Sequence, residues 1–109
     1  MISANLKEEI IKKIAPKNPY KIILFGSHAS GDFDDMSDID LLIVLNTDEM
    51  PQTFKEKSSN YLEVNRLLRD INKKVSMDLV VMTRAQWERF IEQDSGFSRE
   101  VHSKGTHLI

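Results

Sequence analysis

Two short, largely apolar runs, residues 20–25 and 41–45, constrain the fold more than any other feature of this chain. Such runs bounded by turn residues are typical of buried β-strands. The first ends at Gly26 and the second follows directly on Asp40. The segment between them, residues 27–37, is rich in Gly, Ser and Asp and carries no helical pattern. A connection of this kind favours antiparallel pairing, because a parallel pair needs a longer crossover. The second strand is expected to be central and covered on both faces.

Helical patterns surround these strands. Apolar residues at helical spacing predict a first helix that ends before Pro16 and a long amphipathic helix over residues 52–71. Residues 75–82 read as a third strand. The expected apolar face of the long helix consists of Phe54, Tyr61, Leu62, Val64, Leu67, Leu68 and Ile71.

Capping residues mark the last helices. Thr83 with Gln86 three residues later predicts a capping box. Ser95 and Gly96 are expected to end that helix, and residues 97–103 to form a short final one. The order of elements predicts an α/β (α+β) fold, with a small mixed β-sheet flanked by helices. At 109 residues, the chain is expected to form a single domain, residues 1–109.

Composition excludes several classes of protein. A net charge of −2 argues against direct binding of nucleic acid, which usually requires a strong basic excess. The absence of cysteine excludes disulfides, thiolate metal sites and a cysteine nucleophile. The longest apolar run, residues 41–45, is too short to cross a bilayer, and the charged N-terminus is unlike a secretory signal. We therefore expect a cytoplasmic protein with no membrane association.

Asp38 and Asp40 form the first part of a candidate site. Side chains two apart on a strand point to the same face, so these carboxylates repel each other unless a cation lies between them. Mg²⁺ is commonly bound by one or two carboxylates together with phosphates and water. The alternative interpretation is a polar turn that begins the strand.

Asp78 lies within the otherwise apolar third strand. If this strand pairs beside the second, three carboxylates converge, enough for two metal ions or for one ion and a proton acceptor. The alternative is an exposed acid on an edge strand.

Gly26 and Ser27 complete the pattern. A turn of small residues lets backbone N–H groups approach phosphate oxygens. Together with the acids it predicts a site for a nucleoside triphosphate. No Gly-Lys-Ser/Thr follows, as a P-loop would require, and the three-glycine fingerprint of a dinucleotide site is missing.

Gly26-Ser27, ten further residues and Asp38-Ile39-Asp40 resemble the signature of the DNA polymerase β-like nucleotidyltransferase superfamily. Nearly the whole chain is similar to its smallest members, the minimal nucleotidyltransferases or MNT domains. The resemblance implies transfer of AMP from ATP with Mg²⁺, two ions being possible. It implies catalytic and metal-binding roles for Asp38, Asp40 and Asp78, and nucleotide binding by Gly26 and Ser27.

The resemblance also implies a partner. Many relatives are encoded beside a HEPN-domain protein and act as the antitoxin of a toxin–antitoxin pair, by transferring AMP to a tyrosine of the toxin. Two alternatives remain: a non-catalytic antitoxin that neutralises its partner by complex formation, and a nucleotidyltransferase of small molecules. The oligomeric state stays open.

One departure from the family pattern concerns the loop. Many relatives have arginines where this chain has His28 and Ser30. Neither provides the permanent bidentate charge of a guanidinium. We therefore expect weaker triphosphate binding, unless a cation comes from elsewhere, for instance from the partner.

Overall fold

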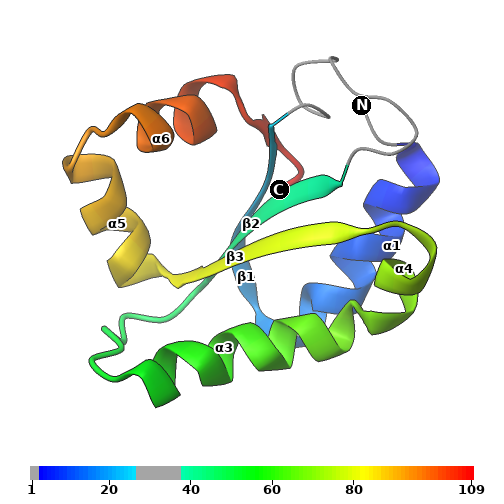
Figure 1. Cartoon of the computed structure of the whole chain (residues 1–109), viewed down its shortest axis with the longest axis horizontal. Helices are drawn as coiled ribbons and strands as arrows, with labels where there is room; N and C mark the ends of the chain where they lie inside the picture. The colour runs from blue at the N-terminus through cyan, green and yellow to red at the C-terminus, as the bar shows by residue number, and fades with distance from the viewer. Residues whose placement is uncertain (1–2, 27–37) are drawn as a thin grey trace.

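The computed structural model describes residues 3–26 and 38–109. Within these residues the centre is a four-stranded sheet in the order β3-β2-β1-β4 (Figure 1). β1 runs antiparallel to β2 and β4, whereas β2 and β3 are parallel. The strands are β1 (Pro19–Phe25), β2 (Ile39–Leu45), β3 (Met77–Thr83) and β4 (Thr106–His107). The predicted mixed sheet and the antiparallel pairing of the first two strands are confirmed.

Helices cover both faces of the sheet (Figure 1). One face packs against α1 (Ala4–Ile14), α3 (Phe54–Leu67) and α4 (Arg69–Lys74). The other packs against α5 (Arg84–Glu92) and the π-helical turn Glu100–Lys104 that follows α6 (Gly96–Arg99). We call these the α1–α3 face and the α5–α6 face. No helix of the described segments is both long and apolar enough to cross a membrane.

The alternating side chains of β2 join the two layers. Ile39, Leu41 and Ile43 are buried among residues of the α1–α3 face. Leu42 and Val44 are buried on the opposite side, in the cluster that contains Trp87. The prediction of a central strand covered on both faces is therefore confirmed, and it explains why this strand is continuously apolar.

The predicted capping box is present at the start of α5. The Thr83 hydroxyl accepts a hydrogen bond from the Gln86 backbone N–H at 3.2 Å, and the Gln86 side chain accepts one from the Thr83 N–H at 2.9 Å. After the break that follows α5, the Ser95 side chain caps the start of α6. These contacts satisfy backbone donors that a helix leaves without partners.

The prediction of one long helix over residues 52–71 is wrong in two respects. It consists of α3 and α4, with Leu68 between them at φ −96° and ψ 6°. Of its expected apolar face, Val64, Leu68 and Ile71 are buried, whereas Phe54 and Leu62 are 85% and 55% exposed. The buried residues form a narrow stripe spaced by four and three, and Leu62 lies on the other side of the helix from Val64.

β4 has no counterpart among the predicted elements, because two residues carry no readable periodicity. It pairs with Ile23 and Leu24 of β1. Gly105 permits this pairing: a Cβ atom there would lie 2.6 Å from the Ile23 Cγ2 atom and against the Val101 carbonyl oxygen.

Candidate active site

The parallel pairing of β2 and β3 places two of the predicted acids side by side. Asp40 and Asp78 are Cα partners in this register. Side chains alternate along a strand, so each points to the same face as the residue two positions later. Those residues, Leu42 and Val80, belong to the α5–α6 face. Both carboxylates therefore extend on that face.

This part of the α5–α6 face is open to solvent. Asp40 is half-buried, and Asp38 and Asp78 are exposed. β3 is the edge strand of the sheet within the described residues, so Asp78 also occupies the position that the alternative interpretation assigned to it. Because Asp78 is exposed on this edge, it is accessible to a ligand as well as to water. Its carboxylate neighbour in register, Asp40, lies within reach of the same ligand.

The observed cluster is smaller than the predicted one. Among residues 3–26 and 38–109, no group of three or more Asp, Glu or His side chains is arranged to hold a metal ion. What is observed is the pair formed by Asp40 and Asp78, with Asp38 directly before β2. Adjacent carboxylates on one open face are the oxygen ligands that Mg²⁺ prefers, so the pair fits such an ion. The metal-binding role of the three acids stays a prediction.

Gly26 links the glycine turn to the acids. Its φ of +74° lies in the left-handed region that favours glycine. A Cβ atom at this position would lie against the Asp40 Oδ2 atom and 3.2 Å from its Cγ. The space left by the missing side chain is therefore the space that the Asp40 carboxylate needs. Ser27, His28 and Ser30 lie outside the described residues, and the predicted role of Ser27 stays a prediction.

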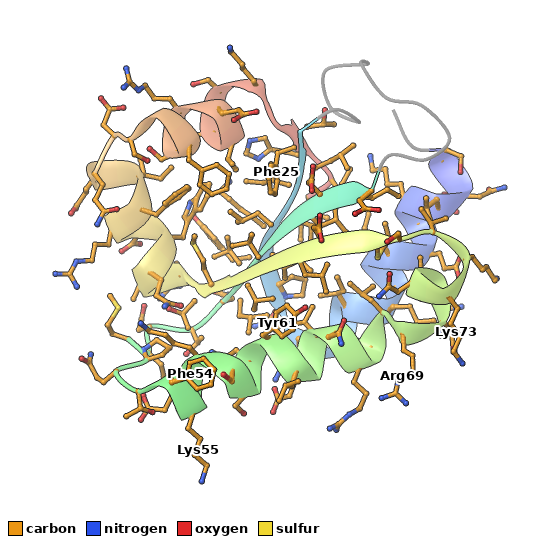
Figure 2. All side chains as sticks on the ribbon, viewed as in Figure 1. Phe25, Phe54, Lys55, Tyr61, Arg69 and Lys73 are labelled. Carbon is orange, nitrogen blue, oxygen red and sulfur yellow. The ribbon has the colours of Figure 1, made fainter. Side chains whose placement is uncertain are left out.

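Three aromatic side chains pack on one another at the end of β1 that leads into Gly26. Phe25, which directly precedes Gly26 and is labelled in Figure 2, packs edge-to-face on Phe97 of α6 with ring centroids 5.5 Å apart. Phe97 packs in the same way on Phe90 of α5. Aromatic pairs of this geometry stabilise by about 1 kcal/mol beyond the area that they bury. α5 and α6 thus hold the end of β1 from which the turn begins.

The arrangement can hold a divalent cation and a polyphosphate. Two carboxylates supply negative oxygen ligands, the glycine turn lets phosphate oxygens approach the backbone, and the open face admits a large substrate. Gly26, Asp40 and Asp78 lie at the ends of three different strands, so only the folded sheet brings them together.

Comparison with known proteins agrees with this chemistry. The sequence profile of the family "Polymerase beta, Nucleotidyltransferase" matches residues 8–106. A candidate protein adenylyltransferase of Methanocaldococcus jannaschii is 57% identical over 37 residues, which cover 34% of this chain and 34% of that protein. The match therefore spans about a third of that relative's length.

Solved structures show the same fold. A candidate nucleotidyltransferase from Sulfolobus solfataricus superposes with a TM-score of 0.62 and 25% identity, over 94% of this chain and 76% of that one. A toxin–antitoxin complex with AMP-PNP superposes with a TM-score of 0.54 and 18% identity, over 94% and 72% of the two chains. A mutant of the toxin–antitoxin complex MntA–HpeT superposes with a TM-score of 0.53 and 16% identity, over 100% and 73%. With the family profile extending over almost all of the described sheet and helices, the chain belongs to the polymerase beta nucleotidyltransferase family.

Proposed function

We propose that this protein is a Mg²⁺-dependent nucleotidyltransferase that moves AMP from ATP to a tyrosine hydroxyl of a HEPN-domain toxin, and so acts as its antitoxin. The observation that carries the proposal is the in-register pair of Asp40 and Asp78, open to solvent beside Gly26. ATP and such a partner both belong to the cytoplasm, which is where we expect this protein to act.

The proposed roles follow from position. Asp38, Asp40 and Asp78 would hold Mg²⁺, which when bound neutralises phosphate charge. Gly26 and Ser27 would bind the triphosphate through backbone N–H groups and the hydroxyl. Asp78, on the exposed edge strand, would take the proton of the acceptor hydroxyl. The acceptor oxygen then forms a bond to the α-phosphorus, the bond from that atom to the bridging oxygen breaks, and pyrophosphate leaves.

Two kinds of observation support a protein acceptor. The relative from M. jannaschii is named as a candidate protein adenylyltransferase, and structures of similar fold are toxin–antitoxin complexes, one of them with AMP-PNP. In addition, α3 exposes the large apolar side chains of Phe54 and Leu62, which a partner protein would cover.

Neutralising two acids tests the proposal. Asp38→Asn combined with Asp40→Asn should reduce transfer of labelled AMP to the co-purified partner by about 100-fold or more, because charge stabilisation is the main source of rate in phosphoryl transfer. The matched control combines Asp70→Asn and Asp94→Asn, which remove the same charge from exposed positions of α4 and of the turn after α5 and should leave transfer unchanged. Undiminished labelling by the Asp38 and Asp40 variant would contradict the proposal.

The alternative, a non-catalytic antitoxin, is favoured by His28 and Ser30 at the places of the family's loop arginines. The same double variant separates the two functions. A catalytic antitoxin loses neutralisation of its partner toxin together with AMP transfer, whereas an antitoxin that acts by occlusion keeps it.

A further inference from the structure

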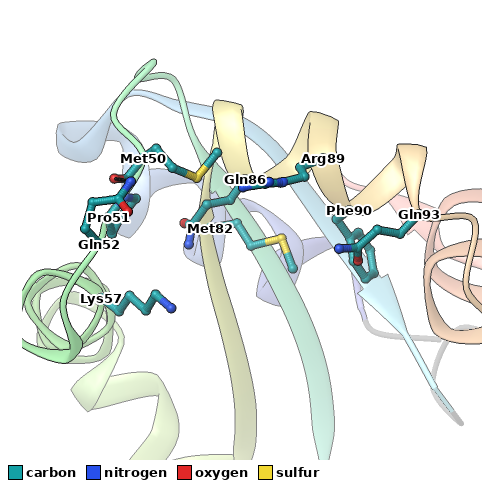
Figure 3. A pocket seen from close by; sticks show the side chains of 9 residues that line it. All are labelled: Met50, Pro51, Gln52, Lys57, Met82, Gln86, Arg89, Phe90 and Gln93. Carbon is teal, nitrogen blue, oxygen red and sulfur yellow. Dashed lines mark hydrogen bonds between the residues drawn. The ribbon is translucent and has the colours of Figure 1, made fainter.

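A cleft of about 390 Å³ opens beside the end of β3, between the start of α3 in one helix layer and α5 in the other (Figure 3). Its wall combines residues of the segment before α3, the first turns of α3, the end of β3 and α5. The lining residues are Met50, Pro51, Gln52, Lys57, Met82, Gln86, Arg89, Phe90 and Gln93. Nothing in the sequence pattern marks them as a group, because they come from four separate segments.

The charged side chains that line the cleft are all positive among the described residues. Of the residues that the structure describes, Lys57 and Arg89 line it, and no carboxylate does. Within the described residues neither cation forms an ion pair or a side-chain hydrogen bond, whereas Lys17 and Arg84 both have carboxylate partners. Figure 3 shows the Lys57 side chain extending toward the cleft from α3. Two unpaired cations among amides and thioethers favour an acidic group carried on an apolar chain.

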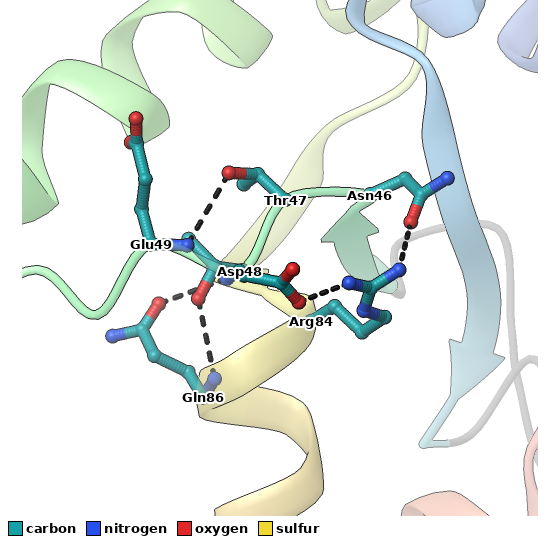
Figure 4. Close-up of polar contacts among 7 residues, drawn as sticks. Asn46, Thr47, Asp48, Glu49, Arg84 and Gln86 are labelled. Atoms are coloured by element: carbon teal, nitrogen blue, oxygen red, sulfur yellow. Dashed lines mark hydrogen bonds and ion pairs between the residues drawn. The ribbon is translucent and has the colours of Figure 1, made fainter.

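Polar contacts hold residues 46–48, the segment that leads to Met50 of the cleft, against the start of α5 (Figure 4). The Arg84 guanidinium donates to the Asn46 Oδ1 atom at 2.7 Å and pairs with Asp48, and the Arg84 backbone N–H donates to the Thr47 carbonyl at 3.1 Å. The hydrogen bond and charge of Asp48 raise the pKa of Arg84. These contacts hold the segment that leads to Met50 in place, so the cleft is formed before any ligand binds.

The cleft includes Met82, which lies on the same strand and the same face as the candidate active site. Asp78 lies four residues earlier on β3. Side chains alternate along a strand, so both extend on the α5–α6 face, as Val80 does between them. Four strand residues span about 13 Å, which is the reach of a short extended peptide.

The outer edge of β3 could receive such a peptide. Among the described residues β3 pairs on one side only, with β2. It contains neither lysine nor proline, the residues that commonly protect edge strands from pairing. A peptide that adds to this edge as a further strand would place residues four apart beside Asp78 and beside Met82.

We infer that this cleft binds an acidic side chain of the acceptor polypeptide, four positions from the residue whose hydroxyl receives AMP. The acceptor then lies in extended conformation along β3, with its hydroxyl at Asp78 and its carboxylate between Lys57 and Arg89. The inference rests on the proposed function and adds the sequence class of its acceptor.

The probes are nine-residue peptides of alternating Val and Thr with one tyrosine and, four positions away, a glutamate or a lysine. Each is made in both sequence directions, since the polarity of the added strand is open. Binding is measured by fluorescence anisotropy without nucleotide, so that the result does not depend on AMP transfer. In one direction, the glutamate peptide should bind about tenfold more tightly than the lysine peptide, as expected for one close charge pair.

Charge reversal gives the matched variants. Lys57→Glu combined with Arg89→Glu should reverse the preference in favour of the lysine peptide. The control combines Lys7→Glu and Lys12→Glu, which make the same charge change at exposed positions of α1 on the other face and should leave the preference unchanged. Circular dichroism of both variants establishes that they are folded.

Three outcomes would overturn the inference: equal binding of the two peptides, an unchanged preference in the Lys57 and Arg89 variant, or weakened ATP binding in that variant, which would assign the cleft to the nucleotide. If AMP transfer is absent but the glutamate preference is present, only the proposed activity fails. If transfer occurs with no preference, only the acidic cleft fails.

Discussion

The two faces of the sheet are built from adjacent residues of the same strands, yet they differ in how completely they are closed. Of the residues that the structure describes, thirteen buried ones form the cluster of the α1–α3 face and five form that of the α5–α6 face. The helices differ accordingly: α1 and α3 have 11 and 14 residues, α5 and α6 have nine and four. Among the described residues, the short helices leave Asp40 and Asp78 accessible on the sheet, and the cleft opens beside α5.

The comparison suggests a division of roles. The α1–α3 face supplies most of the buried apolar area and therefore most of the stability. The α5–α6 face supplies less burial and keeps polar groups accessible. Substitutions at neighbouring positions can test this division directly.

The largest effect is expected from truncating adjacent leucines of β2. Leu41 and Leu42 are both fully buried, on the α1–α3 and α5–α6 faces respectively. Leu41→Ala should lower the free energy of unfolding by about 4 kcal/mol and Leu42→Ala by about 3 kcal/mol, because a less crowded site collapses more fully around the cavity. Urea denaturation measures both. Equal losses would mean that the two faces contribute alike.

A smaller effect is expected at Gly26. Gly26→Ala forces a side chain into the left-handed region and against the Asp40 carboxylate, which should destabilise by about 2 kcal/mol. AMP transfer should fall by about 100-fold, since a displacement of about 1 Å at a reacting group has that effect. The control is Gly96→Ala, where nothing lies within 4 Å of the added Cβ and helix propensity favours alanine. Full activity of the Gly26→Ala protein would show that the position of the Asp40 carboxylate does not depend on a glycine in this turn.

The smallest effect is expected at the cap of α5. Thr83→Ala removes the hydroxyl that accepts the Gln86 N–H and should lower stability by about 1 kcal/mol. Because Gln86 also lines the cleft, glutamate-peptide binding should weaken as well. Thr83→Ser keeps the hydroxyl and should keep most of both quantities. Loss in the serine variant equal to that in the alanine variant would assign the effect to packing of the methyl group.

The strands of the site could be predicted because their signals are local. The apolar run that ends at Gly26, the acids that precede residues 41–45 and the capping box at Thr83 each depend on neighbours in sequence. Helix boundaries were less predictable. The division at Leu68 and the exposure of Phe54 and Leu62 depend on which stripe of α3 meets the sheet, and periodicity alone defines a broader face than the sheet can cover.

By itself, the sequence determined the local backbone of β1 and β2 and predicted which residues have the chemistry for a nucleotide site, since spacing and residue type suffice for both. Tertiary structure alone decided that Asp78 stands in register with Asp40, that Asp40 occupies the space beside Gly26, and that Lys57 and Arg89 share one cleft. These relations join residues far apart in the chain. Their physical reason is the pairing of β2 with β3 and the packing of α3 and α5 on opposite faces of the sheet, which no local pattern encodes.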